Sequence, residues 1–150
     1  MFSSLFQSTV FSSLGNIKER ESLLIYNNMK NTILWYDLET FGLNPRYDRI
    51  AQAAAIRTDM DLNVIDQPLL LYSKLSPDYL PVPESCLVTG ITPQMVNEMG
   101  IRESEMIEKL LSEMMKAGTI TTGFNSIGFD DECIRSTLYR NLYDPYEREY

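Results

Sequence analysis

Alternating hydrophobic and polar stretches along the chain predict a sheet built first from antiparallel strands. The nearly unbroken apolar run from Ile33 to Tyr36 is typical of a central strand covered on both faces, and it is expected to end near Gly42. The stretches 49–58 and 64–75 predict two more strands, the third pairing antiparallel with the second. The first half of the chain is therefore expected to form a β-meander.

In the second half of the chain the spacing of apolar residues changes from that of strands to that of helices. Apolar residues at helical spacing predict a helix over 103–117 that crosses the sheet, then a strand over 119–124, and then a helix over 127–142 capped by Asn125 and Ser126. The proline-rich stretch 76–93 is expected to be a loop with at most short helical turns. A strand, helix, strand order implies a right-handed parallel connection, so the fold class is α/β with a mixed sheet.

The chain is expected to contain one domain. Its 150 residues are enough for a single core, and residues 31–150 carry all the regular patterning. Residues 1–30 show weak periodicity and are interpreted as an N-terminal appendage. Since Met29 stands directly before the first strong strand, translation that naturally begins at Met29 is an alternative.

Composition excludes several classes of function. The chain has no histidine, which removes the common serine and cysteine triads and leaves carboxylate, Tyr, Lys or metal-bound hydroxide as general base. A net charge of -8 does not suit a protein whose whole surface binds polyanions. The two cysteines are far apart, and no apolar run approaches a membrane span, so a cytoplasmic location without a membrane contact is expected.

Two carboxylates follow the first predicted strand. Asp37 and Glu39 are two residues apart, so they project to the same face near the end of the strand. Asp130 belongs to the apolar stripe of the last predicted helix, which it shares with Ile134 and Leu138. Taken one at a time, a solvated Asp-x-Glu and an Asp that only interacts with the helix dipole are the simpler interpretations.

Taken together, the three carboxylates predict a metal site. In sheets of this kind the site lies at the carboxyl ends of the strands, which brings Asp130 beside Asp37 and Glu39. Three adjacent anions repel one another unless cations balance them, and hard oxygen ligands favour Mg²⁺ or Mn²⁺. Two such ions about 4 Å apart are typical of phosphodiester hydrolysis.

Five segments carry a resemblance to a known family: residues 37–42, 51–59, 89–94, 129–132 and 139–146. In order and spacing they resemble the bacterial exodeoxyribonuclease I family of DnaQ-like, or DEDD, 3′–5′ exonucleases, and the similarity runs from about residue 32 to residue 150. It implies a ribonuclease H-like fold and a magnesium-dependent hydrolase of DNA repair that removes 5′ mononucleotides from the 3′ end of single-stranded DNA.

The resemblance also implies roles for individual residues. Asp37, Glu39 and Asp130 match metal ligands at the catalytic site, and Glu39 also lies near the terminal nucleotide. The residues that match contacts to the 3′ nucleotide are Thr40, Phe41, Gly42, Leu87, Thr89, Gly90 and Ile91. In the family a hydrophobic side chain from the loop that contains Leu87 separates the last two bases. The residues that match contacts to the single strand are Arg135, Tyr146 and Tyr150, whereas Tyr139 and Tyr143 are expected to pack. From the residues alone, an ion pair with Asp131 is an equal alternative for Arg135.

The family pattern continues beyond this sequence with a segment that provides a histidine base and a fourth aspartate. The chain is therefore expected to be the N-terminal part of the exonuclease domain, with its metal site incomplete and little activity alone. Two alternatives stay open: a non-catalytic remnant that binds single strands or a protein partner, and a DEDD nuclease that acts on RNA or proofreads a polymerase. The single-strand DNA-binding protein is a partner implied by the family.

Overall fold

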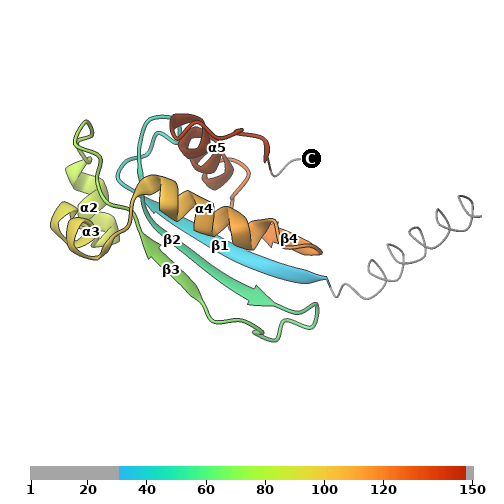
Figure 1. Ribbon diagram of the computed structural model, residues 1–150. Helices are drawn as coiled ribbons and strands as arrows, with labels where there is room; N and C mark the ends of the chain where they lie inside the picture. Colours follow the sequence, from blue (N-terminus) through green and yellow to red (C-terminus); the bar gives the residue numbers. More distant parts are fainter. Residues whose placement is uncertain (1–30, 148–150) are drawn as a thin grey trace, which may run out of the picture. The chain divides into compact units, whose positions relative to one another are not determined.

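A four-stranded sheet forms the centre of the protein, which we describe from a computed structural model over residues 31–147. Figure 1 shows the strands and the helices that follow them. The strands are β1 (Thr32–Thr40), β2 (Ile50–Thr58), β3 (Leu69–Tyr72) and β4 (Thr119–Thr122), in the order β3-β2-β1-β4. The first three strands pair antiparallel and β4 pairs parallel to β1, which confirms the predicted meander and parallel connection.

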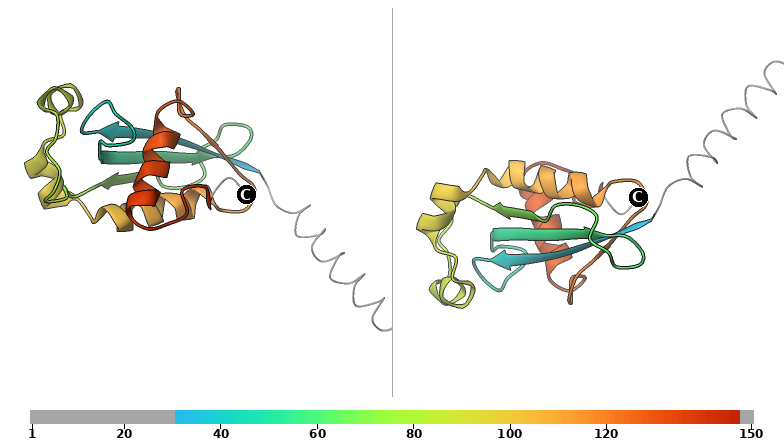
Figure 2. Two further views of the ribbon diagram at one scale, coloured as in Figure 1. Left: turned by 90° about the horizontal axis from the view of Figure 1, so that it is seen from above. Right: turned by 90° about the horizontal axis from the view of Figure 1, so that it is seen from below.

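Within residues 31–147, four helices connect or follow the strands: α2 (Pro83–Thr89), α3 (Pro93–Met99), α4 (Glu103–Met114) and α5 (Asp130–Arg140). The short helices α2 and α3 lie beyond one end of the sheet, whereas α4 and α5 lie across one of its faces (Figure 1). Seen from the opposite side, the strands are in front and no helix of the described residues covers them (Figure 2). The prediction that β1 is covered on both faces is therefore wrong for residues 31–147.

The core lies between the sheet and the helices α4 and α5. On β1 the side chains of Leu34, Tyr36 and Leu38 are buried, and the alternate positions face the open side. Small residues of β2 such as Ala53 let the helices approach the sheet closely. The helices contribute large side chains that are buried in the same cluster: Met106, Ile107, Leu110, Leu111, Met114, Ile134 and Leu138.

The predicted element boundaries differ most from the structure in the third strand, in the stretch 76–93 and at the start of the last helix. The third strand is only four residues long, because Pro68 has no N–H to donate and Val64 forms no more than an isolated bridge with Thr58. The stretch 76–93 contains a full helix, α2, which begins at Pro83, where the missing N–H of proline costs nothing. A local pattern of prolines does not distinguish a helix start from a loop.

The last helix begins three residues later than predicted. Asn125 has a positive φ of 53°, which interrupts the helix, and the chain turns through residues 125–129 before α5 starts at Asp130. No side chain caps α5, so the expected capping by Asn125 and Ser126 is wrong. Instead, the carbonyl of Ser126 accepts the N–H of Asp131 at 2.8 Å.

Candidate active site

The carboxylates of β1 lie on the open face of the sheet, near the end of the strand. Asp37 is exposed and Glu39 is partly buried, while their neighbours on either side point into the core. The register of β1 and β2 shifts between Glu39 and Thr40, which marks a bulge at this point. Burial and then the charge of Asp37 raise the pKa of Glu39. The two carboxylates therefore share one face, as the spacing predicts.

Asp130 reaches the same region from the helix layer. Strand β4 pairs with β1 as far as Trp35, and beyond that residue no strand among residues 31–147 pairs with this edge of β1. Asp130 is buried there and accepts the backbone N–H of Leu38 at 3.1 Å. Burial and then the charge of Asp37 raise the pKa of Asp130 to about 6, although the Leu38 hydrogen bond opposes the shift. The inward orientation predicted for Asp130 is confirmed.

Two contacts hold the start of α5 in place against β1. The hydroxyl of Tyr36 donates a short hydrogen bond to Asp131, so Asp131 does not simply point to water as its place in the helix suggests. Gly123 lies next to the carbonyl of Tyr36, where an added Cβ would be only 2.5 Å from the oxygen. The chain between β4 and α5 thus passes close enough to β1 to place Asp130 at the strand edge.

The donor chemistry of Asp37, Glu39 and Asp130 suits a hard divalent cation, and the charge of Asp37 adds to burial in raising the pKa values of Glu39 and Asp130. Within residues 31–147, however, no three His, Cys, Asp or Glu side chains lie close enough together to hold a metal ion. The two strand carboxylates and the helix carboxylate are neighbours without forming a closed ligand set.

A cleft of about 280 Å³ adjoins the carboxylates. Of the residues expected to hold the terminal nucleotide, Glu39, Thr40, Gly42 and Thr89 line it. Its other walls, which the sequence did not indicate, come from the loop after β1, from α2 and its flank, and from the turn before α5: Leu43, Val82, Glu84, Ser85, Val88 and Phe129. The cleft is therefore bounded by segments that are distant in sequence.

The remaining residues of the expected nucleotide site lie around the cleft. Phe41 and Ile91 are buried together with Val96, so they support the cleft from behind. Leu87 is 84% exposed on α2, and Gly90 ends this helix with a left-handed φ of 73°. The structure gives Leu87 the free apolar side chain that a base-separating contact requires.

Asp48 fixes the loop between β1 and β2 beside the cleft. One carboxylate oxygen accepts the N–H of Asn44 and the other accepts the hydroxyl of Tyr79, both at 2.8 Å. An added Cβ on Gly42 would lie 2.0 Å from the Asp48 carboxylate, so only glycine fits there. Burial and the bond to Asp48 raise the pKa of Tyr79. No short-range pattern links Asp48 with Tyr79, which is why sequence reasoning missed them.

Arg135 and Tyr146 come together, as their shared role in the resemblance requires. The Arg135 guanidinium lies 6.0 Å from the centre of the Tyr146 ring, within the range of a cation–π contact. The Arg135 guanidinium also forms an ion pair with Glu132, one turn earlier on α5. Tyr150, the appendage 1–30 and the alternative start at Met29 all fall outside the described residues.

Among residues 31–147 no helix combines the length and the apolar character needed to cross a lipid bilayer.

Comparison with known proteins agrees with this arrangement. The family model described as "Exonuclease" matches residues 34–150. Exodeoxyribonuclease I of Haemophilus influenzae is 51% identical over 112 residues, which are 75% of this chain and 24% of that protein. The chain thus spans about a quarter of the length of this relative.

Two solved structures show the same similarity in three dimensions. Escherichia coli exonuclease I in complex with a dA16 oligonucleotide is 46% identical with a TM-score of 0.76, over 79% of this chain and 26% of that one. A complex described as "ExoI/SSB-Ct" is 45% identical with a TM-score of 0.78, over 80% of this chain and 26% of that one.

Proposed function

Since the chain belongs to the exonuclease family and has its ribonuclease H-like fold, we propose that it is part of a metal-dependent 3′–5′ exonuclease that releases 5′ mononucleotides from single-stranded DNA. The observation that carries the proposal is the meeting of Asp37, Glu39 and Asp130 at the end of β1, beside a cleft. The similar exonuclease I that was solved with dA16 supports DNA as the substrate.

The chain's own residues provide the binding part of this activity. The 3′-terminal nucleotide occupies the cleft between Thr40, Gly42 and α2, and Leu87 reaches out to separate the last two bases. Arg135 neutralises a phosphate further along the strand, and the Tyr146 ring beside it stacks on a base. Both contacts are independent of base identity, which suits an enzyme that degrades any sequence.

The carboxylates provide the metal-binding part. Asp37, Glu39 and Asp130 would hold Mg²⁺ or Mn²⁺, and a bound cation would supply an activated water and charge stabilisation at the leaving oxygen. Because these three side chains do not form a closed ligand set in residues 31–147, we expect a fourth carboxylate from a segment that follows this region in the relatives to complete the site.

The absence of histidine should lower the rate at which the chain hydrolyses DNA. A positioned general base contributes about 10²–10⁴-fold to a hydrolysis, and the chain has no histidine to act as one. We therefore expect the 150-residue chain alone to degrade DNA about 10²–10⁴-fold more slowly than a full-length relative. Adding the downstream segment of a relative as a separate polypeptide should restore release.

The experiment follows the stepwise shortening of a 5′-labelled, single-stranded DNA with Mg²⁺ present, with and without the added segment, since each released nucleotide leaves the labelled strand one residue shorter. Asp37→Asn should abolish the restored release. Asp61→Asn removes the same charge from the exposed β2–β3 turn and should have no effect. Full-rate release by the chain alone would contradict the need for the segment, and release that survives Asp37→Asn would contradict the assigned site.

The same assay separates the alternatives. A non-catalytic remnant binds the labelled strand but releases nothing when the segment is added. An RNA-directed enzyme is inhibited more strongly by unlabelled RNA than by unlabelled DNA of the same length. The "ExoI/SSB-Ct" complex supports the single-strand DNA-binding protein as a partner of the whole enzyme, which would act in the cytoplasm.

A further inference from the structure

A second groove, of about 670 Å³, runs along the outer side of α5. We call it the α5 groove and define it by Arg46, Tyr47, Arg49, Arg135, Tyr139 and Tyr146. Two segments, residues 42–49 and 129–146, line the α5 groove and also contribute to the wall of the cleft. Leu43 and Phe129 line the cleft, whereas Arg46 and Glu132, three residues further along each segment, line the groove. The α5 groove thus begins close to the cleft along both segments.

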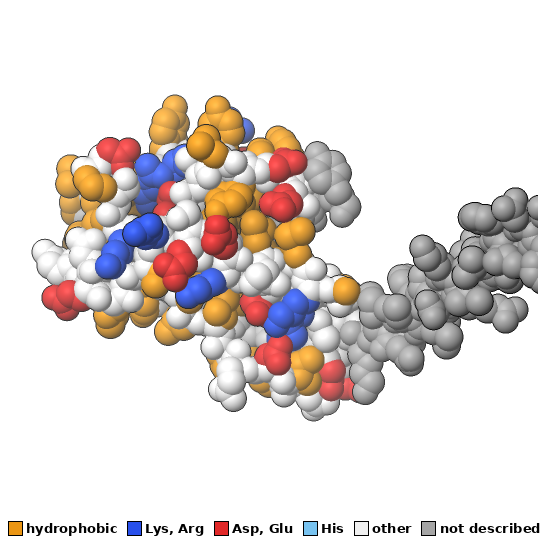
Figure 3. All heavy atoms as spheres, viewed as in Figure 1, with side chains coloured by type: hydrophobic (Ala, Val, Ile, Leu, Met, Phe, Trp, Pro, Cys, Tyr) orange, Lys and Arg blue, Asp and Glu red, His pale blue; other side chains and the backbone are white. Residues whose placement is uncertain are grey.

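The α5 groove concentrates positive charge in an acidic protein. The chain carries a net charge of -8, yet four of the nine lysines and arginines in residues 31–147 line this one groove. Figure 3 shows basic side chains gathered near α5, close to hydrophobic ones. At the back of the groove Arg49 and Arg140 share Glu103, but Arg140 Nε and Nη1 are buried without a hydrogen-bond partner. The groove thus keeps donor capacity that its own acidic residues do not use.

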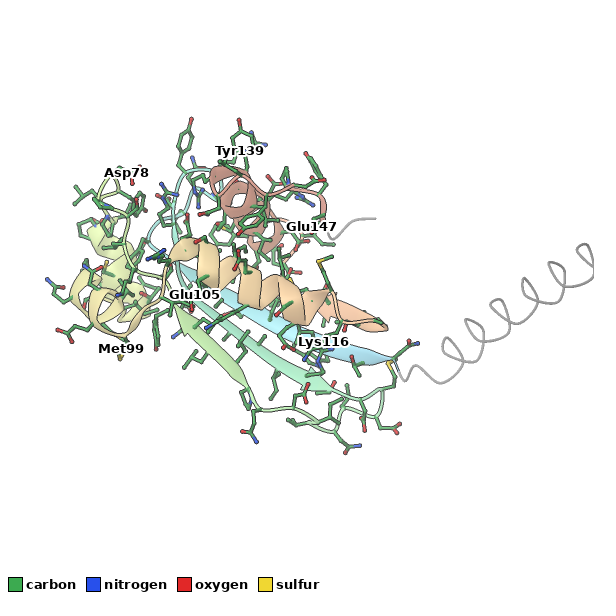
Figure 4. All side chains as sticks on the ribbon, in the orientation of Figure 1. Asp78, Met99, Glu105, Lys116, Tyr139 and Glu147 are labelled. Atoms are coloured by element: carbon green, nitrogen blue, oxygen red, sulfur yellow. The ribbon has the colours of Figure 1, made fainter. Side chains whose placement is uncertain are left out.

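Aromatic side chains stand around these charges. Tyr47 and Tyr139 are 76% and 73% exposed, and Tyr146 is half exposed beside Arg135. Tyr139 lies on the side of α5 that faces away from the sheet (Figure 4), so the expectation that it packs is wrong. Tyr143, in contrast, packs against the core as expected. Exposed tyrosines around arginines are the arrangement that single-stranded nucleic acids recognise by stacking and phosphate contacts.

Glu132 lies between the two sides of the groove. Its carboxylate forms an ion pair with Arg46 from the β1–β2 loop, at 3.8 Å, and another with Arg135 from α5. Arg46 and Glu132 are both solvent-accessible, so this pair is weak and exchangeable. A phosphodiester group carries the same single negative charge and can take the place of Glu132 between the two arginines.

We propose that the α5 groove binds the single strand upstream of the terminal nucleotide, with Arg46 holding a phosphate, Tyr47 and Tyr139 stacking on bases, and Glu132 serving as an internal counter-ion that the phosphate displaces. The proposal rests on the proposed function and adds Arg46, Tyr47, Tyr139 and Glu132 to the strand contacts inferred for Arg135 and Tyr146. In the free protein Glu132 keeps Arg46 and Arg135 in position, and its charge lowers the affinity of the groove for single-stranded DNA.

The test measures binding of a fluorescein-labelled dT12 oligonucleotide to the full chain by fluorescence anisotropy, in EDTA, so that no hydrolysis takes place. Tyr139→Ala should weaken binding roughly tenfold, because one stacked base is lost. Glu132→Gln should tighten binding about fivefold, since the competing charge is removed. Arg46→Gln should weaken binding and make its dependence on salt concentration less steep.

Two matched controls separate a local effect from a change in net charge. Glu105→Gln and Lys109→Gln change the same charges on the outer surface of α4, where the two residues pair with each other (Figure 4 labels Glu105). Each should alter the affinity less than twofold. Tightening by Glu105→Gln equal to that by Glu132→Gln would overturn the counter-ion role, and wild-type binding by Tyr139→Ala would overturn the stacking role.

The outcomes also distinguish this proposal from the proposed function. Tighter binding by Glu132→Gln cannot come from a folding defect, so it supports the groove even if another variant is unstable. If the groove variants bind dT12 like the wild type while Asp37→Asn still abolishes nucleotide release, the groove proposal fails and the exonuclease proposal stands. If the groove variants change binding of dT12 as expected while Asp37→Asn leaves nucleotide release intact, the groove proposal stands and the assigned exonuclease site fails. Failure of the wild-type chain to bind dT12 overturns the groove proposal.

Discussion

The two faces of the sheet differ in almost every physical respect, although the same strand supplies both. On one face Leu34, Tyr36 and Leu38 are buried beneath α4 and α5. On the other face Trp35 is 40% exposed and Asp37 lies next to solvent. An open groove of about 490 Å³ runs over this second face, and its lining is apolar apart from Asp37: Trp35, Ala54, Ile56, Pro68, Leu70 and Phe124 are among its residues.

This difference shows where the candidate active site can lie. The covered face gives rigid positions, and Asp130 is held there by the packing of α5 and by the N–H of Leu38. The open face gives access, so Asp37 can meet water, ions and substrate. The three carboxylates are neighbours at the edge of β1 beyond Trp35, where the covered layer and the open layer meet.

The largest effect should come from removing a side chain of the covered face. Leu110 of α4 is completely buried, so Leu110→Ala should lower the free energy of unfolding by about 3 kcal/mol. Leu70 of β3 lies on the open face and is mostly exposed, so Leu70→Ala should cost less than about 1 kcal/mol. Urea denaturation followed by circular dichroism measures both. Similar losses would show that the open face is buried in solution.

A smaller, pH-dependent effect should come from the boundary between the faces. The pKa of Asp130 is raised to about 6, so the folded protein binds more protons than the unfolded chain between about pH 4 and pH 6. Stability should therefore fall as the pH rises through this window. Asp130→Asn keeps an oxygen for the Leu38 N–H and removes the buried charge, so it should stabilise the metal-free protein by about 2 kcal/mol near pH 7.5, and by less near pH 4.

Urea titrations in EDTA at both pH values measure this difference. Asp61→Asn serves as the control, because its carboxylate is exposed in the β2–β3 turn. A loss of stability in Asp130→Asn at pH 7.5 would contradict the buried, ionised state of Asp130. Mg²⁺ that binds at Asp130 should reduce the advantage of the variant, since the cation balances the charge that the asparagine removes.

The smallest effect on stability should accompany a clear change in association. The open face and the free edges at β3 and β4 are expected to make the 150-residue chain self-associate. Leu70→Thr should change the free energy of unfolding by less than about 1 kcal/mol and should lower the concentration dependence of the sedimentation coefficient. Met60→Thr, in the exposed β2–β3 turn, should change neither quantity. A wild-type chain that sediments as a monomer at all concentrations would contradict the expectation.

Much of this architecture follows from local sequence patterns. The period of two along β1 predicts that Asp37 and Glu39 share a face, and the period of 3.6 along α5 predicts that Asp130 points inward with Ile134 and Leu138. The meander, the position of β4 and its parallel pairing follow in the same way. These features depend on which residues lie two, three or four positions apart, and that information is present in a single segment.

Other features depend on segments that meet only in the folded chain. The cleft has walls from the loop after β1, from α2 and from the turn at Phe129, and the α5 groove joins Arg46 to Tyr139. The bond from Tyr79 to Asp48 and the exposure of Trp35 both arise from long-range packing. A side chain's neighbours across the fold decide its burial and its partners, so periodicity within one element does not contain them.

The sequence by itself thus determined the strands, their pairing, and the orientation of the three carboxylates, because side-chain direction is a local property of the backbone. Only the tertiary structure decided that no helix of residues 31–147 covers one face of the sheet, that α5 starts at Asp130, and that the basic and aromatic residues of two distant segments form one groove. Those outcomes depend on which elements pack against each surface, and the pattern within a single segment does not specify its packing partners.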